Sequence, residues 1–424
     1  MAGILAESSR LSVMNFLNEA ANQYPNAISF ASGRPAESYF SLERWLAAIP
    51  AFQEHAALSA GHTLLQAGRR IAQYGPTAGV INALIARQLR IDERIECEAE
   101  QVIVTAGCQE ALSLAVPALC RAPGEVMLAR NPTYIGVTGA ADFAGVEIVP
   151  VEVRTGETWE QALGGIAAQL RRTGKTPRGF YLTPEFDNPT GTVLTEAERR
   201  SIVAGCAEHR IVVLEDNPYG MFRFEGDAPP PMAALDDVGC VIYLATYSKT
   251  LCPAVRVGAA VVPKHLFGSA AAAERLRAEL SERKSFATVN TSQVTQALVG
   301  GVLLTEGCTL AGLVEAPRSH YRRNRDALLD ALDRAFGGRE DIAWNRPEGG
   351  FFLRLSLPFE FGRQETAECA REQGVIVMPM TFFSLDATRR REVRLAFSNA
   401  EPAEIEAGVQ RFARYVEQTS LRSR

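Results

Sequence analysis

Short apolar runs alternate with longer helical patterns through the middle of this chain, and that alternation restricts its fold more than any other feature. Strands that alternate with helices predict a mainly parallel sheet, covered by helices on both faces. Seven apolar runs have the length of strands: Val102–Ala106, Glu125–Ala129, Glu147–Val153, Gly179–Thr183, Ile211–Glu215, Val241–Ala245 and Val257–Val262. The helical patterns between them include Gln109–Leu119, Thr158–Arg172 and Glu196–His209.

The seventh run follows the sixth too closely for a helical crossover, so we expect it to pair antiparallel. After about residue 265, long helical patterns dominate and shorter apolar runs follow them, which predicts a second, smaller α/β lobe. The expected helices are Ser269–Ser281, Thr291–Leu304 and Glu315–Ala335, and the expected strands are Gly350–Leu357, Val375–Pro379 and Val393–Ser398. The first 50 or so residues show helical patterns but no strand pattern, and we expect them to wrap onto this lobe or onto a partner subunit.

The chain of 424 residues is therefore expected to be an α/β protein with two domains. A large domain with a mainly parallel seven-stranded sheet is expected to span residues 61–290. A smaller C-terminal α/β domain is expected to span residues 291–424, and residues 1–60 are expected to form an N-terminal arm and part of the small domain.

Composition and charge exclude several kinds of partner. A hydrophobic fraction of 47% and a charged fraction of 22% are typical of a soluble globular protein. The net charge of −5 offers no electrostatic attraction to nucleic acid or to an anionic membrane. No apolar run reaches the roughly 20 residues that span a bilayer, and the N-terminus does not resemble a signal peptide. We therefore expect a cytoplasmic protein.

The cysteines give no sign of a metal site. The eight cysteines form no C-x-x-C pair, and no two of them lie near a histidine at metal-ligand spacing. We interpret them as free thiols in a reducing compartment and expect no bound metal.

Lysine occurs only at positions 175, 249, 264 and 284, so a reaction that needs a lysine amine has four candidates. Lys249 lies in the segment Tyr243–Gly258, where a strand ends and a polar cluster follows it. Ligands of open parallel sheets bind just beyond the carboxyl ends of strands. A lysine that is desolvated there has a lowered pKa and forms a Schiff base, while Ser248 and Arg256 suit a phosphate. The plainer interpretation of Lys249 is a solvated loop lysine.

Three further strand ends carry polar residues. The chain passes from a strand through Gly107 directly into a helix, whose free N–H groups and positive dipole end suit a phosphate. Asn188 precedes a proline and is held extended, so its amide can bind a ring oxygen. Asp216 and Tyr219 follow a buried strand, where a carboxylate suits a pyridinium N–H. Each has a plain structural interpretation when taken alone: a glycine turn, an Asn-Pro turn, or a helix cap or surface carboxylate.

Together these strand ends provide contacts for a phosphate, a ring oxygen, a ring nitrogen and an aldehyde, in the chain order that a cofactor crevice needs. At this point the sequence resembles the fold-type I enzymes that use pyridoxal 5′-phosphate (PLP), specifically the class I and II aminotransferases. The resemblance covers nearly the whole chain. The N-terminal segment of this chain is most like that of the aromatic and 2-aminoadipate subgroup. The matching elements are Tyr74–Gly79, Thr105–Gln109, Pro132–Tyr134, Asn188–Gly191, Glu215–Tyr219, Ser248–Thr250 with Arg256, and Arg394–Ser398.

The resemblance implies a fold-type I architecture, PLP as cofactor, and named roles for individual residues. Lys249 would form the Schiff base and move the proton at the substrate Cα, Asp216 would pair with the pyridine nitrogen, and Tyr134 would stack on the ring. The remaining cofactor contacts implied are Gly107, Cys108, Gln109, Asn188, Tyr219, Ser248 and Arg256. Arg394 is implied to bind the substrate α-carboxylate, with Gly33, Arg34 and Asn188 also lining the substrate pocket. Tyr74 is implied to reach the phosphate of the neighbouring subunit, which implies a homodimer.

Three residues depart from the family's pattern and keep alternatives open. Cys108 stands where a serine is usual, Asp187 stands where a neutral residue is usual, and Arg34 is unusual between a glycine and a proline. Arg34 would either bind a second acidic group of a substrate or point to solvent. The leading expectation is amino transfer between an L-α-amino acid and a 2-oxo acid. The alternatives are a PLP-dependent β- or γ-elimination, replacement or C–C bond-forming synthase on the same fold, and a non-catalytic regulatory module, which the absence of a basic N-terminal domain disfavours.

Overall fold

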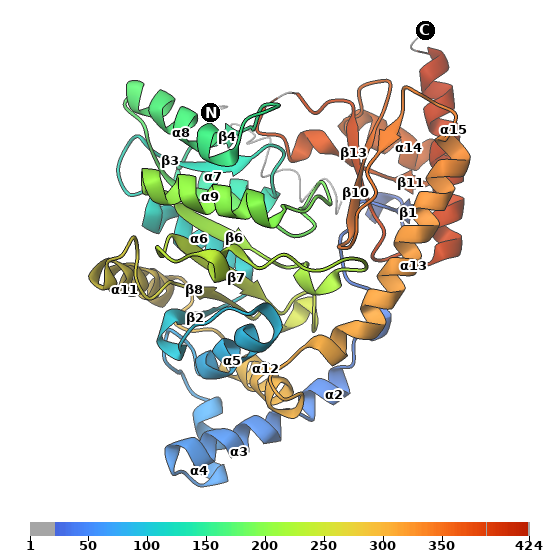
Figure 1. The fold of residues 1–424 in the computed structure, drawn as a ribbon. Helices are drawn as coiled ribbons and strands as arrows, with labels where there is room; N and C mark the ends of the chain where they lie inside the picture. The colour runs from blue at the N-terminus through green and yellow to red at the C-terminus, as the bar shows by residue number, and fades with distance from the viewer. Residues whose placement is uncertain (1–21, 387, 423–424) are drawn as a thin grey trace, which may run out of the picture.

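A seven-stranded sheet forms the centre of the larger of two lobes (Figure 1). The computed structural model describes residues 22–386 and 388–422. The order of the strands in the large sheet is β2-β8-β7-β6-β5-β3-β4. Their bounds, each within a few residues of the predicted ones, are β2 (Val102–Thr105), β3 (Glu125–Arg130), β4 (Ile148–Val151), β5 (Thr176–Leu182), β6 (Val212–Asp216), β7 (Val241–Thr246) and β8 (Gly258–Val261).

The direction of the strands confirms the expected topology. Strands β3 to β7 pair with one another in parallel. Strand β8 pairs antiparallel with both of its neighbours, β2 and β7, as its short connection predicts. As a result β2 runs in the same direction as β7, and the first residue of β8, Gly258, lies between the carboxyl ends of these two strands, at Thr105 and Thr246.

Helices cover both faces of the large sheet, because successive strand residues point to opposite sides. Ile103 packs with α6, α7 and α11 on one face, whereas its neighbour Val104 packs with α5 and α12 on the other. Farther along the sheet, Leu128 and Val213 pack with α8 and α9. The helices of this lobe are α5 (Asn82–Glu93), α6 (Cys108–Leu119), α7 (Ile135–Ala144), α8 (Trp159–Arg172), α9 (Glu196–His209), α10 (Met232–Leu235), α11 (Ala270–Ala287) and α12 (Gln293–Thr305), with short 3-10 turns η2 (Ala99–Gln101), η3 (Gly220–Phe222) and η4 (Pro253–Val255).

Local sequence fixes where the helices of the large lobe begin. Thr158 and Thr195 each form a capping box with the third residue of the helix that follows, so that α8 and α9 start at defined positions. Helix α6 instead starts after Gly107, whose φ of +80° is accessible to glycine at little cost. The chain therefore turns abruptly from β2 into α6.

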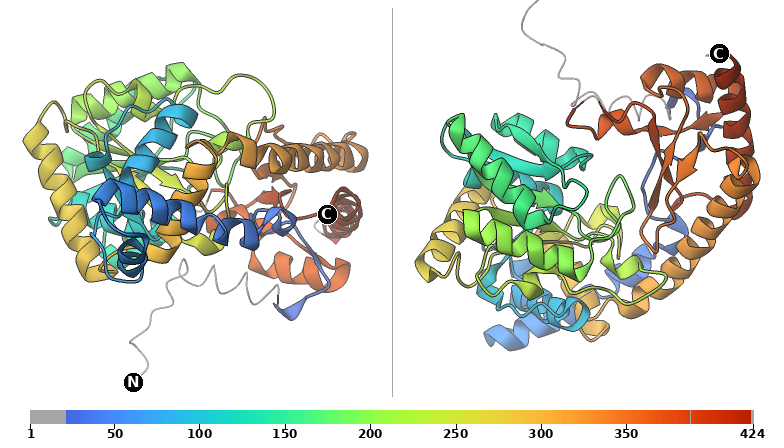
Figure 2. Two further views of the ribbon diagram at one scale, coloured as in Figure 1. Left: turned by 90° about the horizontal axis from the view of Figure 1, so that it is seen from below. Right: turned by 45° about the horizontal axis from the view of Figure 1, so that its top comes forward.

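The smaller lobe holds the rest of the described C-terminal chain. Its four-stranded sheet has the order β12-β13-β10-β9, and the long helix α13 lies beside the C-terminal helix α15 along one side of it (Figures 1 and 2). Its core is rich in phenylalanine, including Phe351, Phe352 and Phe397. The elements are α13 (Ala311–Phe336), β9 (Ala343–Trp344), β10 (Phe352–Ser356), α14 (Arg363–Gln373), β11 (Val375–Ile376), β12 (Met378–Pro379), η5 (Met380–Phe382), β13 (Glu392–Ala396) and α15 (Pro402–Arg422).

The described N-terminal segment contacts both lobes. We expected no strand in the first 50 or so residues, but Ile28–Ser29 forms β1 and pairs in parallel with β11 of the smaller lobe. Two residues are too few to show a periodic pattern in the sequence. The helices that follow pack toward the larger lobe, where Trp45 and Phe52 share a hydrophobic cluster with α12. These elements are η1 (Glu37–Tyr39), α2 (Leu42–Leu46), α3 (Ile49–Ala60) and α4 (Leu64–Ile71).

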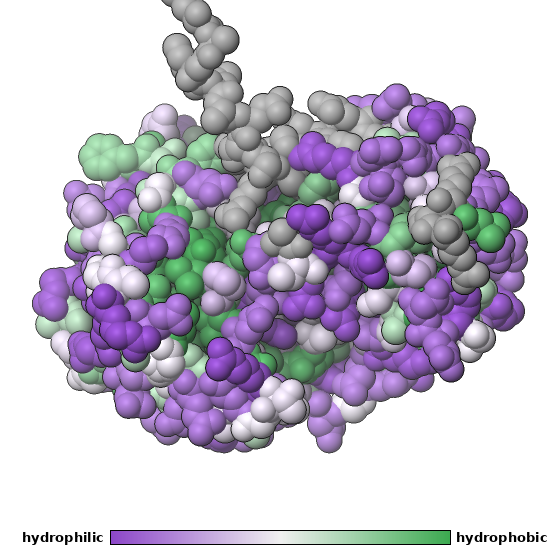
Figure 3. Space-filling model, turned by 90° about the horizontal axis from the view of Figure 1, so that it is seen from above, coloured by the Kyte–Doolittle hydropathy of each residue, from purple (hydrophilic) through white to green (hydrophobic). Residues whose placement is uncertain are grey.

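Hydrophobic packing does not divide at residues 60 and 290, since the cluster that contains Trp45 also contains Val299 and strands of the large sheet. The proposed domain limits therefore remain a prediction. On the face seen in Figure 3, hydrophilic residues cover most of the surface and hydrophobic residues gather in a few areas between them. None of the helices in the described part of the chain is long and apolar enough to cross a membrane.

Candidate active site

The carboxyl ends of β2, β5, β6 and β7 meet at one edge of the large sheet, facing the smaller lobe. A cavity of about 520 Å³ lies at this edge and is lined by residues of both lobes. Every residue that the sequence singled out for a site lines this cavity, except Gly107 and Tyr74. Those that line it are Gly33, Arg34, Cys108, Gln109, Tyr134, Asn188, Asp216, Tyr219, Ser248, Lys249, Arg256 and Arg394.

Lys249 follows the carboxyl end of β7 and points into the cavity. Its ammonium donates a hydrogen bond to the Gly33 carbonyl oxygen at 3.1 Å and lies 5.8 Å from the centre of the Phe351 ring. Burial, together with the positive charges of Arg394 and Arg256, lowers the pKa of Lys249 from 10.5 to about 8. Lys249 is therefore a desolvated amine, and the interpretation as a solvated loop lysine is wrong.

Asp216 is the last residue of β6 and is buried. One carboxylate oxygen accepts a hydrogen bond from the Tyr181 hydroxyl at 2.8 Å, and the other accepts one from the Cys108 thiol at 3.3 Å. Burial raises the pKa of Asp216 from 3.8 to about 6, while these two hydrogen bonds and the charge of Lys249 oppose that shift. The side chain is a buried acceptor with uncharged donors.

The turn at Gly107 packs directly against Arg256. A Cβ atom at Gly107 would lie 2.4 Å from an Arg256 Nη atom and would displace the guanidinium, and the φ of +80° disfavours any residue but glycine. The Arg256 guanidinium donates to the Ala106 carbonyl oxygen at 3.0 Å and to the Ser248 hydroxyl at 3.3 Å. The start of α6, Ser248 and a guanidinium thus gather at one place, where an anion would be stabilised.

The side chains of the two residues after Gly107 have partners of their own. The thiol of Cys108 is directed to Asp216, and burial raises its pKa well above 9.0. The amide of Gln109 donates to the Gly136 carbonyl oxygen at 2.8 Å, in the first turn of α7. At this turn the backbone N–H groups of the helix start, rather than these two side chains, are left for an anion.

Arg394 comes from β13 and enters the cavity from the smaller lobe. Its guanidinium lies between two rings, 4.2 Å from the centre of Phe352 and 4.8 Å from that of Phe383. It donates to the Asn188 side-chain oxygen at 2.7 Å and to the Ala31 carbonyl oxygen. Burial lowers the pKa of Arg394 from 12.5 to about 10. The Nε atom is buried without a hydrogen-bond partner among the described residues, which leaves a donor for a carboxylate.

The side chains of Tyr219, Tyr134 and Asn188 complete the wall of the cavity. Tyr219 packs edge-on against Phe352, and burial raises its pKa although a hydrogen bond to Asn188 opposes the shift. Tyr134 is the residue before α7, and burial raises its pKa as well. Both phenols are therefore neutral hydrogen-bonding groups at physiological pH.

The remaining predicted residues lie at or beyond the edge of the cavity. Arg34 is exposed and lines the cavity. Asp187 is buried, and its carboxylate accepts a hydrogen bond from the Thr190 hydroxyl at 2.7 Å, inside its own turn. It does not line the cavity, and the hydrogen bonds that it accepts from Thr190 support the turn that carries Asn188. Tyr74 lies outside the cavity of its own chain and is 79% exposed.

Several lining residues were not identified from the sequence. Tyr181 is at the carboxyl end of β5, and the same strand-end argument that found Asp216 could have found it. Phe352 and Phe383, which hold the Arg394 guanidinium, carry no such signal, because they come from the smaller lobe and meet the site only in the fold.

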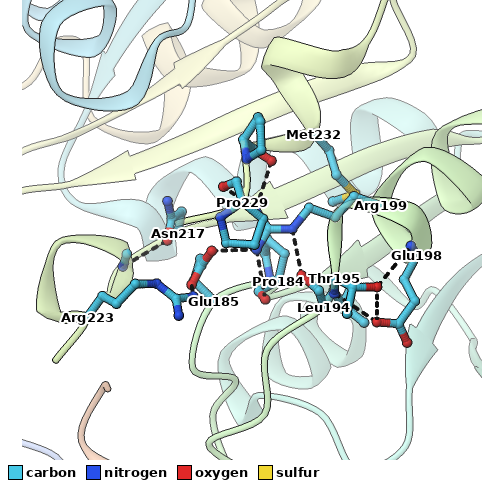
Figure 4. Close-up of polar contacts among 12 residues, drawn as sticks. Pro184, Glu185, Leu194, Thr195, Glu198, Arg199, Asn217, Arg223, Pro229 and Met232 are labelled. Carbon is cyan, nitrogen blue, oxygen red and sulfur yellow. Dashed lines mark hydrogen bonds and ion pairs between the residues drawn. The ribbon is translucent and has the colours of Figure 1, made fainter. Parts of the chain in front are cut away.

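A second cluster of buried charges contacts both ends of the segment 184–194 (Figure 4). Arg199 is fully buried and donates to the carbonyl oxygens of Pro184, Leu194, Pro229 and Pro230, at 3.0 to 3.4 Å. It also forms an ion pair with Glu185 at 2.5 Å, and Glu185 forms another with Arg223 at 2.7 Å. Arg223 reaches Glu348 of the smaller lobe at 2.9 Å. This network ties both ends of the segment 184–194 to the rest of the fold.

The family model described as aminotransferase class I and II matches residues 25–412. The (S)-3,5-dihydroxyphenylglycine transaminase of Amycolatopsis orientalis is 37% identical over 408 residues, which cover 95% of this chain and 91% of that protein.

Solved structures of aminotransferases superpose on nearly the whole of this chain. The multiple substrate aminotransferase from Thermococcus profundus superposes with a TM-score of 0.81 at 25% identity, covering 100% of this chain and 97% of that one. The alpha-aminoadipate aminotransferase of Thermus thermophilus, complexed with N-(5′-phosphopyridoxyl)-L-leucine, superposes with a TM-score of 0.77 at 27% identity, covering 98% of this chain and 97% of that one.

Proposed function

The chain belongs to the aminotransferase class I and II family, and on that premise we propose that it moves the amino group of an aromatic or other large apolar L-α-amino acid to a 2-oxo acid, in the cavity around Lys249. It is a PLP-dependent amino-acid aminotransferase of the fold-type I architecture. The observation that carries the proposal is that an amine, a carboxylate and a guanidinium, at Lys249, Asp216 and Arg394, line one cavity with only uncharged hydrogen-bond partners.

The residues present fit PLP. Asp216 would accept a hydrogen bond from the ring nitrogen, and Lys249 would supply the amine to which the cofactor is attached. Asn188 and Tyr219 would bind the ring oxygen, and the Tyr134 ring would lie against the cofactor ring. The close approach of the Gly107 backbone to Arg256, beside Ser248, supports a phosphate-binding role for this turn. Arg256 has no acidic partner within ion-pair distance among the described residues, so its charge is available for a phosphate.

The chain's own groups would carry out the remaining steps. When bound, PLP supplies an electron-withdrawing ring that takes up the electron pair left at the substrate Cα. Arg394 would bind the substrate α-carboxylate in a bidentate pair, which fixes the bond at Cα that faces Lys249. Because the pKa of Lys249 is lowered to about 8, part of its amine is neutral near neutral pH and would accept the Cα proton. The Asp216 carboxylate would keep a proton on the ring nitrogen.

The substrate preference rests on the apolar part of the wall. Ile135, Ile376, Met378, Phe352 and Phe383 line the cavity together with Arg394. These side chains would bury an aromatic or aliphatic substrate side chain by the hydrophobic effect. The (S)-3,5-dihydroxyphenylglycine transaminase of Amycolatopsis orientalis, a relative that acts on an aromatic amino acid, supports such a preference. Arg34 at the rim would then point to solvent or meet the second carboxylate of an acidic acceptor.

We further propose a cytoplasmic homodimer in which Tyr74 completes the neighbouring site. The exposure of Tyr74, outside the cavity of its own chain, supports this part of the proposal. The eight free cysteines suit a reducing compartment. A complementation experiment tests the dimer. Tyr74→Ala and Lys249→Ala proteins, each inactive alone, should regain activity when unfolded and refolded together, because mixed dimers hold one intact site. No recovery in a mixture that forms dimers would contradict the role of Tyr74.

The reaction is tested with a panel of amino acids and 2-oxoglutarate. Phenylalanine, tyrosine, phenylglycine and leucine should give glutamate and the matching 2-oxo acid with higher kcat/KM than aspartate or 2-aminoadipate. A preference for the acidic donors would overturn the substrate assignment, and release of ammonia or loss of a side chain would point to elimination or replacement chemistry instead. Borohydride reduction followed by peptide mapping should place the pyridoxyl label on Lys249 and on none of Lys175, Lys264 and Lys284.

A further inference from the structure

Lys284, near the end of α11, is a fully buried lysine. The sequence places it at the charged end of a helix, where a solvated side chain is the simplest expectation. In the structure its side chain is 0% exposed and its amine donates to Glu110 at 2.7 Å. The amine also donates to the Thr288 hydroxyl at 3.0 Å, and that hydroxyl donates to the second Glu110 oxygen at 2.6 Å. Both oxygens of the Glu110 carboxylate are therefore held from α11 and its end.

Glu110 connects this cluster to the turn at Gly107. It lies in the first turn of α6, and one of its oxygens accepts a hydrogen bond from the Ala106 backbone N–H at 2.6 Å. The carbonyl oxygen of the same residue, Ala106, accepts a hydrogen bond from the Arg256 guanidinium at 3.0 Å. A continuous path of hydrogen bonds thus runs from Lys284 through Glu110 and Ala106 to Arg256.

The path ends at two parts of the proposed phosphate site. Gly107 has a φ of +80°, and the Arg256 guanidinium lies directly against its backbone. The Thr105 hydroxyl donates to the Gly107 carbonyl oxygen at 3.0 Å, which fixes the other side of the turn. Glu110 is the side chain that holds the N–H group of this turn, and Lys284 and Thr288 hold Glu110.

Stability alone does not explain a buried pair of this kind. Desolvating an ammonium and a carboxylate costs about as much as their attraction returns, so an apolar pair of similar volume is often as stable. Moreover, a carboxylate in the first turn of a helix is already favoured by the helix dipole. What the pair provides, and an apolar pair does not, is a fixed orientation of the carboxylate toward the Ala106 N–H.

We propose that Lys284, Glu110 and Thr288 are positioning residues that set the Gly107 turn and, through Ala106, the Arg256 guanidinium, for the phosphate of the cofactor. The inference rests on the proposed phosphate role of this turn. It assigns no contact with substrate to any of the three residues. Arg394, which would bind the substrate carboxylate, belongs to β13 of the other lobe and has no part in this path.

The test measures the equilibrium affinity of the apoprotein for PLP, by absorbance or tryptophan fluorescence, rather than activity. Lys284→Met should weaken PLP binding by roughly 10- to 100-fold, the loss that removal of an outer hydrogen-bonding partner causes at metal sites. Glu110→Gln keeps an oxygen for the Ala106 N–H and should weaken binding less. The variant that combines Lys284→Met with Glu110→Gln leaves no uncompensated charge buried. It should therefore bind PLP more tightly than Lys284→Met alone.

The chain offers a matched control. Lys175 and Glu147 form an ion pair at 2.6 Å, almost the same length, but their side chains are 37% and 51% exposed. Lys175→Met and Glu147→Gln should leave the PLP affinity unchanged. The KM for the amino acid, measured at saturating PLP, should also stay unchanged in Lys284→Met, whereas a general loosening of the fold would raise it.

An unchanged PLP affinity in folded Lys284→Met would overturn the inference, as would a rise in the amino-acid KM equal to the loss in PLP affinity. If Lys284→Met does not fold, Thr288→Val takes its place, since it removes one donor to Glu110 at constant volume. A Thr288→Val protein with wild-type PLP affinity would then overturn the proposal. Failure of the wild-type protein itself to bind PLP would instead overturn the functional assignment, so the two failures are distinguishable.

Discussion

Two groups of buried charges in this protein are built in opposite ways. In the cavity, Lys249, Asp216 and Arg394 have hydrogen-bond partners that are all uncharged: a carbonyl, a phenol, a thiol and an amide. In the network of Figure 4, Arg199, Glu185 and Arg223 each have an opposite charge at 2.5 to 2.9 Å. Both groups contact the segment 184–194, through Asn188 in the cavity and through Pro184, Glu185 and Leu194 in the network, so the main difference between them is their pairing.

This difference in pairing shows that the fold tolerates the desolvation cost of unpaired charges in the cavity. A desolvated charge without an opposite partner loses its preference for the charged state. Accordingly, the pKa of Lys249 falls to about 8, that of Arg394 falls to about 10 and that of Asp216 rises to about 6. The paired network has a structural role, while the unpaired cavity keeps its charges available for a ligand.

The largest effect is expected from breaking the unpaired group at Lys249. Lys249→Ala should reduce kcat by about 10³-fold or more, since it removes both the point of attachment and a proton-transfer group that alone contributes roughly 10²–10⁴-fold. The free energy of unfolding of the apoprotein should not fall, because the lost amine was desolvated without an opposite charge. Steady-state kinetics and urea unfolding measure the two effects. Lys264→Ala, at an exposed lysine, is the control. A clear loss of stability in Lys249→Ala would show that the cavity charges are structural after all.

An intermediate effect, on stability, is expected from breaking the paired group. Arg199→Leu leaves Glu185 buried beside Arg223 alone and removes the donors to the carbonyl groups of two loops. The free energy of unfolding should fall by about 3–5 kcal/mol, as when one partner of a buried pair is removed. The adjacent Arg200, 58% exposed and paired with Glu196, is the control, and Arg200→Leu should cost about 0.3–0.5 kcal/mol. Equal losses from the two substitutions in urea unfolding would contradict the structural role of Arg199.

The smallest effect on stability is expected at Glu93. This residue belongs to neither group, because it does not line the cavity and forms no ion pair with a described residue. Burial raises its pKa from 4.5 to about 8, with Asp92, Glu215 and Glu185 adding repulsion and a hydrogen bond to Tyr243 opposing the shift. Since the folded pKa exceeds the ordinary one, the favourable contribution is complete below pH 4.5 and is lost as pH rises through about 8.

Glu93→Gln should therefore unfold with a free energy about 1–2 kcal/mol higher than that of the wild type at pH 9, and the difference should shrink toward pH 5. Thermal or urea unfolding at several pH values measures it. Glu96→Gln, at a 75% exposed side chain, should show no such pH dependence. If the Glu93→Gln and wild-type curves run parallel across this range, the burial of an ionisable Glu93 is refuted.

Much of the fold could be predicted from the sequence, because each strand of the large sheet is a continuous apolar run and its direction follows from the length of the connection. The seven strands and the reversal of β8 agree with those expectations. Strand β1 could not be predicted, since two residues show no period and their pairing with β11 joins positions 28 and 375. Nor could the sequence show that α12 packs with Trp45 of the N-terminal segment.

The residues of the site also divide into those with a local sequence signal and those without one. Lys249, Asp216 and Asn188 were found because each follows a strand end, which is a local property. Arg394 had no local signal among forty arginines and was found through the family resemblance alone. The contacts between them could not be predicted. Arg394 meets Asn188 across 206 positions of sequence, and Lys284 meets Glu110 across 174, and a sequence pattern reports neither.

The segment from Ala31 to Gly33 has a consequence for how the enzyme takes up a ligand. Its carbonyl oxygens accept hydrogen bonds from Arg394 and from Lys249, the two cationic groups that a substrate carboxylate and a cofactor aldehyde would engage. The main chain therefore stands in for the oxygen atoms of the ligand. A substrate carboxylate at Arg394 would exchange one set of acceptors for another, and exchange of equivalent hydrogen bonds changes the free energy little. The segment 31–33 also connects β1 to the helices that pack toward the larger lobe, so a ligand at these two cations would lie against the link between the lobes.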